Sequence, residues 1–217
     1  MKVRDRLDLI QQEQQKYDHL YHRDACALPI EQRATHMTLL FFKYSGLIAK
    51  SRSHYDTEIL NNAIADTFIN CFAFASMFDY SLSDKIPFAD YDRIVTLEDL
   101  GKILSYCAEY NFNESFCLNQ SLAIPIGHLA KICLSLDHVD AYFYREEIID
   151  NVAAISSATL VAAYKRDIKM QTHVHYRLTT AEVNSIFRQK NGVTTPLAEE
   201  TTEGEAGRSH QITSYRT

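Results

Sequence analysis

The sequence predicts an all-α protein, a helical bundle built from two helical hairpins with extra helices at its N-terminal and C-terminal ends. One observation is that no stretch alternates polar and apolar residues with period two for long enough to indicate a strand. Another is that the pattern G-x-[LI]-A-K occurs twice, at Gly46–Lys50 and at Gly127–Lys131, each time before an apolar run that contains an aspartate. Repeated hairpins normally bury their apolar faces against each other, so we expect about four main helices in one bundle.

Composition and charge fit one compact globular bundle. The chain has 217 residues, of which 46% are apolar and 23% are charged. Its formal net charge of -6 gives no sign of the concentrated basic surface that nonspecific phosphate binding requires. We therefore expect no nucleic-acid partner, and no apolar run reaches the roughly 18 residues of a membrane span.

The cysteines favour a reducing compartment. The five cysteines are odd in number and scattered, they lie mostly in apolar runs, and no C-x-x-C spacing indicates zinc. No signal peptide opens the sequence. We expect reduced, buried thiols and a cytoplasmic protein.

The first half is expected to hold three helices. Residues 1–28 form an N-terminal unit, whose helix over 1–23 has a narrow apolar stripe. The bundle itself spans 29–192, and its first repeat, about 30–80, begins with a helix over 30–50. A second helix over 58–80 is apolar nearly all round, which is typical of a central position.

One polar line crosses this apolar helix. Asn62, Asp66 and Asn70 follow each other at intervals of four residues, so they share one face. A polar line that faces an interior requires hydrogen-bonding partners there.

The second half is expected to repeat the arrangement after a linker over 81–95. Thr96 caps a short helix that ends near residue 110. The second repeat, about 114–168, holds a helix over 114–136 that Pro125 kinks or splits, and a long helix over 142–168. A final short helix, capped at Thr179–Glu182, ends near residue 192, and the tail 193–217 is expected to be disordered.

This arrangement resembles the all-α nucleoside triphosphate pyrophosphohydrolases, the MazG-like and dimeric dUTPase-like superfamily. In that pattern, an E-x-x-E helix beside a Gly-Glu-Leu-Ala-Lys-like run is followed one hairpin later by E-x-x-D. The resemblance spans about residues 30–80 and 118–165 in a tandem, degenerate form. It implies carboxylates that hold Mg²⁺ against substrate phosphates, and it implies a homodimer.

Carried over by position, the second copy keeps Glu147 and Asp150 of E-x-x-D. These two carboxylates also lie three apart on one expected helix face, where they can converge on one ion. Pro125 and His128 stand in place of E-x-x-E. Histidine suits softer metals than Mg²⁺, and proline has no ligating side chain.

The first copy keeps only Asp66. Tyr44, Leu47 and Ala63 stand at the other three acid positions. Three acids therefore remain of the eight that two complete copies would hold, so the resemblance implies a degenerate member of the family.

The candidate site residues follow from these positions. The acids and the lysines among them also have a structural interpretation. The acids could be solvated or salt-bridged surface residues, and the lysines could lie at helix ends because their charge favours the helix dipole. The candidates are Glu147, Asp150 and Asp66 for a divalent ion, Lys131 and Lys50 for phosphate, and His128, Asn151 and Asn70 as further pocket residues.

Two functions remain open at this point. The first is a MazG-like protein that binds or weakly hydrolyses a nucleotide, or binds another phosphorylated small molecule, with Mg²⁺; no catalytic residue is assigned. The second is a non-catalytic helical scaffold or interaction protein that kept the fold and lost the metal site, its pocket refilled by Tyr44, Leu47 and Pro125.

Overall fold

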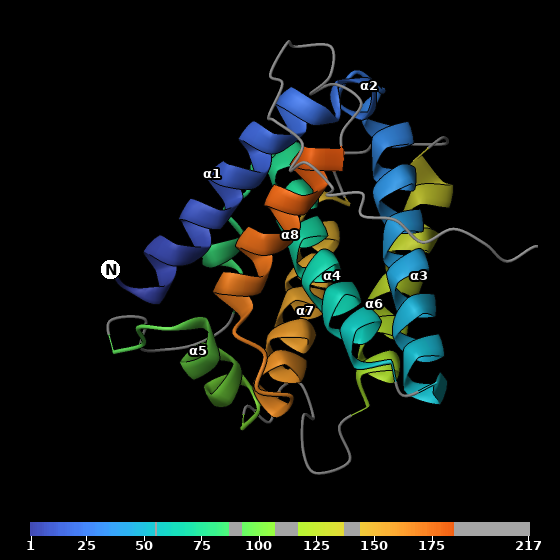
Figure 1. Cartoon of the computed structure of the whole chain (residues 1–217). Coiled ribbons are helices and arrows are strands. Elements are labelled where there is room, and N and C mark those ends of the chain that lie inside the picture. The colour runs from blue at the N-terminus through green and yellow to red at the C-terminus, as the bar shows by residue number, and fades with distance from the viewer. Residues whose placement is uncertain (55, 87–92, 107–116, 137–143, 185–217) are drawn as a thin grey trace, which may run out of the picture.

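The computed structural model describes residues 1–54, 56–86, 93–106, 117–136 and 144–184. All regular structure in these ranges is helical, which confirms the predicted class (Figure 1). None of the described helices is long and apolar enough to cross a membrane. The elements are α1 (Val3–Tyr21), α2 (Arg23–Cys26), α3 (Ile30–His54), α4 (Thr57–Met77), the 3₁₀ turn η1 (Leu82–Asp84), α5 (Leu97–Leu104), α6 (Leu118–Leu136), α7 (Arg145–Lys165) and α8 (Met170–Asn184).

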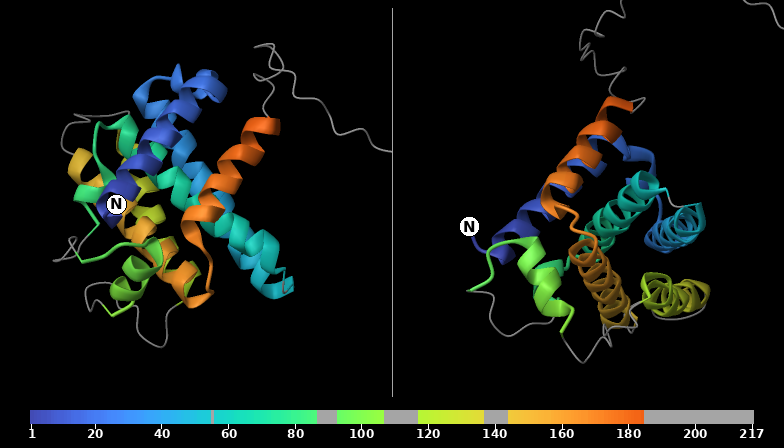
Figure 2. Two further views of the ribbon diagram at one scale, coloured as in Figure 1. Left: turned by 60° about the vertical axis from the view of Figure 1, so that its left-hand side comes forward. Right: turned by 60° about the horizontal axis from the view of Figure 1, so that its bottom comes forward.

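The helices form three layers, best seen in Figures 1 and 2. Helices α3 and α6 pack side by side at one edge of the molecule, α4 and α7 form the middle layer, and α1, α5 and α8 cover the other side. Because the middle layer is covered on both sides, its helices are apolar around most of their circumference. In α7 every residue from 155 to 163 is buried. The helix predicted over 58–80 corresponds to α4, and it is central as predicted.

Aromatic rings fill much of the core around α4. Phe41 of α3 stacks on Phe74 of α4 with ring centroids 5.9 Å apart, and Phe74 stacks in turn on Phe78 at the same distance. Phe68 and Phe72 meet edge to face at 4.9 Å. Such pairs add to the stabilisation that their buried area provides.

The two middle helices end in the same way. Asp79 after α4 and Asp167 after α7 both adopt left-handed backbone angles, with φ of 56° and 53°. In each case the next residue donates its amide to a carbonyl five residues earlier, Tyr80 to Ala75 and Ile168 to Ala163. This is the bonding of a Schellman cap, in which the left-handed residue is usually glycine.

The expected linker over 81–95 is partly core. Leu82, Ser83 and Ile86 are buried, and so is Ile94, whose carbonyl accepts the amide of Val3 at 3.0 Å. These side chains pack beneath α1, so the segment joins the N-terminal helix to the bundle. Residues 87–92 of this linker lie outside the described residues.

One helix prediction is wrong, and one of two alternatives for another is excluded. The expected cap at Thr179–Glu182 lies inside α8, because the hydroxyls of Thr179 and Thr180 donate to the carbonyls of His175 and Tyr176 within the helix instead of capping a new one. Pro125 does not split its helix, since α6 runs continuously through it. Proline removes one backbone donor, and the packing of α6 on both α3 and α7 holds the helix together.

Several boundaries expected from the sequence cannot be compared with the structure. The predicted helix end near residue 110, the start at 114 and the tail 193–217 lie outside the described residues. The helix expected over 142–168 corresponds to α7, Arg145–Lys165.

Candidate functional site

The polar line of α4 finds its partners on α8 and α3. Asn62 Oδ1 lies 2.9 Å from Nε2 of His173, and Asn70 donates from Nδ2 to the Met37 carbonyl at 3.2 Å. Asp66, between them, binds Arg177. Because Asn62 and Asp66 are four residues apart, as are His173 and Arg177, the two helices match in register. The expectation that this line has interior partners is confirmed.

Asp66 and Arg177 form a two-point ion pair. Arg177 donates from Nε to Oδ1 and from Nη2 to Oδ2, both at 2.8 Å. Only 17% of the Asp66 side chain and 26% of the Arg177 side chain are exposed. The hydrogen bonds to Asp66 raise the pKa of the Arg177 guanidinium, so Arg177 stays protonated. The carboxylate that the family pattern would give to a metal is therefore bound by a cation from the protein itself.

Tyr44 stands beside this pair. Burial, and then the negative charge of Asp66, raise the pKa of its hydroxyl to about 12. The phenol thus remains neutral at physiological pH. Tyr44 occupies one of the motif positions where a glutamate is expected, and it supplies a neutral ring there in place of a carboxylate.

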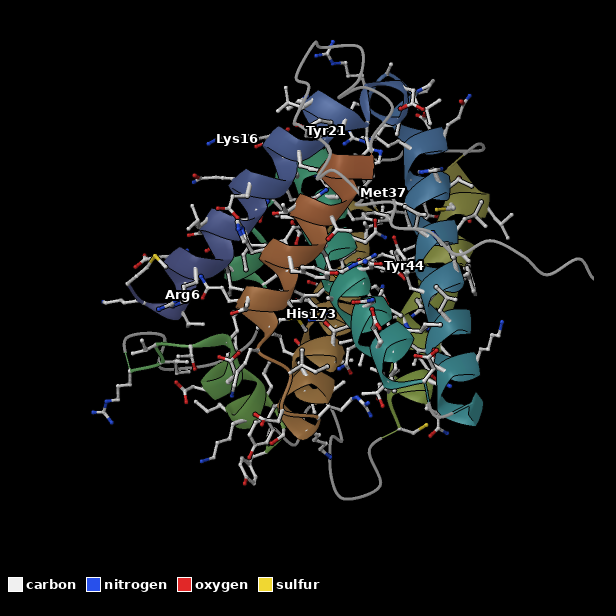
Figure 3. The ribbon with its side chains drawn as sticks, viewed as in Figure 1. Arg6, Lys16, Tyr21, Met37, Tyr44 and His173 are labelled. Carbon is white, nitrogen blue, oxygen red and sulfur yellow. The ribbon has the colours of Figure 1, made fainter. Side chains whose placement is uncertain are left out.

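These three residues line a pocket of about 680 Å³, which we name the Arg177 pocket. Side chains from α1, α2, α3, α4 and α8 form its walls. In Figure 3, Met37 and Tyr44 lie on the side of α3 that faces α4 and α8, and Tyr21 lies at the end of α1. The volume is in the range typical of small-molecule sites.

One wall of the Arg177 pocket carries a buried acceptor. Gln14 is 4% exposed, and its Nε2 donates to Asp18 Oδ1 at 2.8 Å. Its Oε1 is buried and has no hydrogen-bonding partner. Burial raises the pKa of Asp18, an effect that the Gln14 hydrogen bond and the charges of His22 and Arg33 reduce. A ligand N–H or O–H group would satisfy the free acceptor.

Aromatic rings and cations occupy the same pocket. The ring of Tyr17 lies 5.0 Å from Tyr21 and 5.3 Å from His22, measured between centroids. Arg33 and Lys43 of α3 also line the pocket, and Lys43 Nζ lies 5.0 Å from the ring centre of Tyr44. Flat rings beside cations suit a ligand that combines a ring with an anionic group.

Two of the three acids predicted for a metal are held in different ion-pair networks. Asp66 binds Arg177, whereas Asp150 accepts Lys85 Nζ at 3.1 Å on an exposed surface. Lys85 also binds Glu146 at 2.5 Å, and Glu147 is exposed on the first turn of α7. Within the described ranges, no group of three or more His, Cys, Asp or Glu side chains is arranged to hold a metal ion. The side chains in these ranges therefore do not form a Mg²⁺ site.

Most of the other predicted site residues lie away from the Arg177 pocket. Lys50, Lys131 and His128 are exposed on α3 and α6, at the molecular edge. Asn151 donates to the Glu147 carbonyl of its own helix at 2.7 Å, the ordinary bonding of a helix-surface asparagine. Asn70 alone joins Asp66 in lining the Arg177 pocket.

Sequence reasoning missed the residues of α8. The signal was present: His173 and Arg177 are spaced by four, as are Asn62 and Asp66. Placing the last helix start at residue 179 concealed it. Comparisons of the chain with protein-family models, with curated proteins and with solved structures found no match.

Proposed function

We propose that this protein is a non-catalytic helical module that binds a nucleotide or another phosphorylated small molecule in the Arg177 pocket, without a metal ion. The observation that carries the proposal is the two-point binding of Asp66 by Arg177 inside that pocket. A guanidinium that occupies both carboxylate oxygens is a fixed cation, so the protein does not need a divalent ion to neutralise this acid.

Three features of the Arg177 pocket support this ligand class. Tyr17 and Tyr21 offer faces on which a heteroaromatic base can stack. Arg33 and Lys43 offer donors for phosphate oxygens, with the planar guanidinium able to bind two oxygens together. The free Oε1 of Gln14 offers an acceptor for a base or sugar donor.

A second proposal keeps the chemistry that the resemblance implies: a MazG-like nucleoside triphosphate pyrophosphohydrolase that uses Mg²⁺. The observation in its favour is that Asp66, the one acid retained by the first copy, lines the pocket. Asp150 and Glu147 lie on another surface, so Asp66 is the one protein ligand that this proposal assigns to the Mg²⁺ ion. The reducing, cytoplasmic setting expected from the cysteines and the homodimer implied by the resemblance belong to both proposals.

Titration calorimetry with the common nucleoside triphosphates separates the two functions. We expect binding of at least one nucleotide with equal affinity in Mg²⁺ and in EDTA, and no pyrophosphate release. Arg33→Gln and Lys43→Gln are expected to weaken that binding about tenfold each, the effect of losing a charge-assisted hydrogen bond.

Lys102→Gln on α5 is the matched control, because it makes the same change at an exposed lysine that does not line the pocket. Binding that requires Mg²⁺ and disappears in Asp66→Asn would favour the hydrolase. If no nucleotide binds and none is hydrolysed, both proposals are wrong, and a scaffold without this ligand is left.

A further inference from the structure

The outward face of α3 and α6 is apolar although it is exposed. Leu39 and Phe42 on α3 are 60% and 47% exposed, and Ile124 and Leu134 on α6 are 64% and 77% exposed. The two helices pack against each other, and their other main contacts among the described helices are with the middle-layer helices α4 and α7. Among the described residues, no helix covers this side of the edge layer (Figure 2). Clusters of exposed large apolar side chains mark interaction sites.

On each of these two helices, the exposed apolar side chains run along one side. On α3, Leu39, Phe42 and Gly46 follow intervals of three and four residues. On α6, Ile124, Gly127 and Leu134 follow intervals of three and seven, which also keep one side of a helix. An added Cβ at Gly46 or Gly127 would meet nothing within 4 Å. The two glycines therefore leave room where the backbone of another helix can approach.

This edge is basic in an acidic protein. The sequences of α3 and α6 contain one acid, Glu31, against five lysines and arginines, which gives a formal charge of +4 for these helices while the whole chain carries -6. Lys43, Lys50 and Lys131 are exposed. Lys43 also lines the Arg177 pocket, whereas Lys50 and Lys131 each lie four residues after the exposed glycine of their own helix, beside its exposed apolar side chains.

The positive charge of this edge distinguishes between the molecules that could bind there. A second copy docking face to face would bring the lysines of one edge onto those of the other, and such like-charge contacts disfavour association. A partner with acidic side chains around an apolar stripe would satisfy both features of the edge. An amphipathic helix can lay its apolar face on exposed apolar side chains of this kind.

We infer that the outward face of α3 and α6 is a docking surface for an acidic amphipathic helix of another protein. The apolar stripe of that helix packs on Leu39, Phe42, Ile124 and Leu134, and its carboxylates face Lys50 and Lys131. This interaction is separate from the Arg177 pocket and does not rest on the function proposed for it.

The test uses the full chain and two designed helical peptides, each with leucines at heptad a and d positions. One peptide carries glutamates at the remaining positions and the other carries lysines. We expect the acidic peptide to bind at least tenfold more tightly in fluorescence anisotropy. This advantage should decrease as salt rises from about 50 mM to about 500 mM, because charge attraction at a surface is screened.

Leu39→Glu combined with Ile124→Glu should weaken acidic-peptide binding at least tenfold. Both side chains are exposed, so the fold is expected to persist, and thermal melting of the variant checks this. Ile103→Glu on α5 is the control, since it places the same charge at an exposed apolar residue away from the edge layer.

Several outcomes would overturn the inference. These are equal binding of the two peptides, no binding of either, unchanged binding in the double variant, and a dimer in sedimentation that the double variant dissociates, which would assign the face to a second copy. Binding only to vesicles of phosphatidylcholine and phosphatidylserine would instead assign it to a membrane surface.

Discussion

Arg177 binds both carboxylate oxygens of Asp66, although the two residues lie 111 positions apart. The contact joins α8 to α4. It also occupies the carboxylate that the resemblance would assign to a metal ion. It therefore links the last described helix, the middle layer and the Arg177 pocket.

Arg177→Met should destabilise the fold by about 2 kcal/mol, because the variant leaves the mostly buried Asp66 carboxylate without its cation. Urea unfolding at neutral pH measures the change. Arg166→Met is the control: its Nε binds Asn61 on an exposed surface at 3.2 Å, and its loss should cost less than about 0.5 kcal/mol. In Arg177→Met with Asp66→Asn, the loss should be smaller than the sum of the single losses. Additive losses would show that the two side chains do not interact.

Glycines in this protein should respond in opposite directions to alanine. At Gly101 of α5, an added Cβ would lie 2.5 Å from the Leu160 carbonyl oxygen and 3.1 Å from Tyr164 Cβ, so Gly101→Ala should destabilise by about 1–3 kcal/mol. At Gly46 and Gly127 the space is open, and alanine should stabilise by about 0.5–1 kcal/mol because it favours helix. Thermal or urea unfolding of the three variants checks the signs. A stabilised Gly101→Ala would contradict the close packing of α5 on α7.

Stability should fall as pH drops through 6.5, in part because of His173. Burial, and then the charge of Arg177, lower the pKa of this imidazole below its usual value of 6.5. Between the lowered and the usual value the unfolded chain binds a proton that the folded chain does not, so acid favours unfolding in that window. The free energy of unfolding measured between about pH 7.5 and 5.5 should therefore decrease less steeply in His173→Gln. His175→Gln, two residues along on the exposed side, is the matched control variant. Identical slopes in the two variants would remove His173 as the cause.

Cys71 should resist thiol reagents in the folded protein. Its side chain is fully buried in α4, and burial raises the pKa of the thiol well above its usual value, which suppresses the reactive thiolate. Mass spectrometry after brief iodoacetamide treatment should find Cys71 unmodified in native protein and modified in urea. Cys133, which is only half-buried, serves as the internal comparison. Equal labelling of both thiols under native conditions would contradict the buried position.

The sequence determined the helical class and the central place of α4, because burial on all sides requires apolar residues around the whole helix, and this pattern is local. It also indicated that Asn62, Asp66 and Asn70 need partners. The candidates Glu147 and Asp150 shared a helix face as expected, but a shared face does not decide which surface of the bundle that face meets.

Only the tertiary structure decided that Asp66 meets Arg177 while Asp150 meets Lys85. Helix periodicity depends on neighbours three and four residues away, whereas the partner of a polar side chain depends on which helices pack together and in what register. Those choices are set by the joint burial of all three layers, so they cannot be read from any single stretch of the chain.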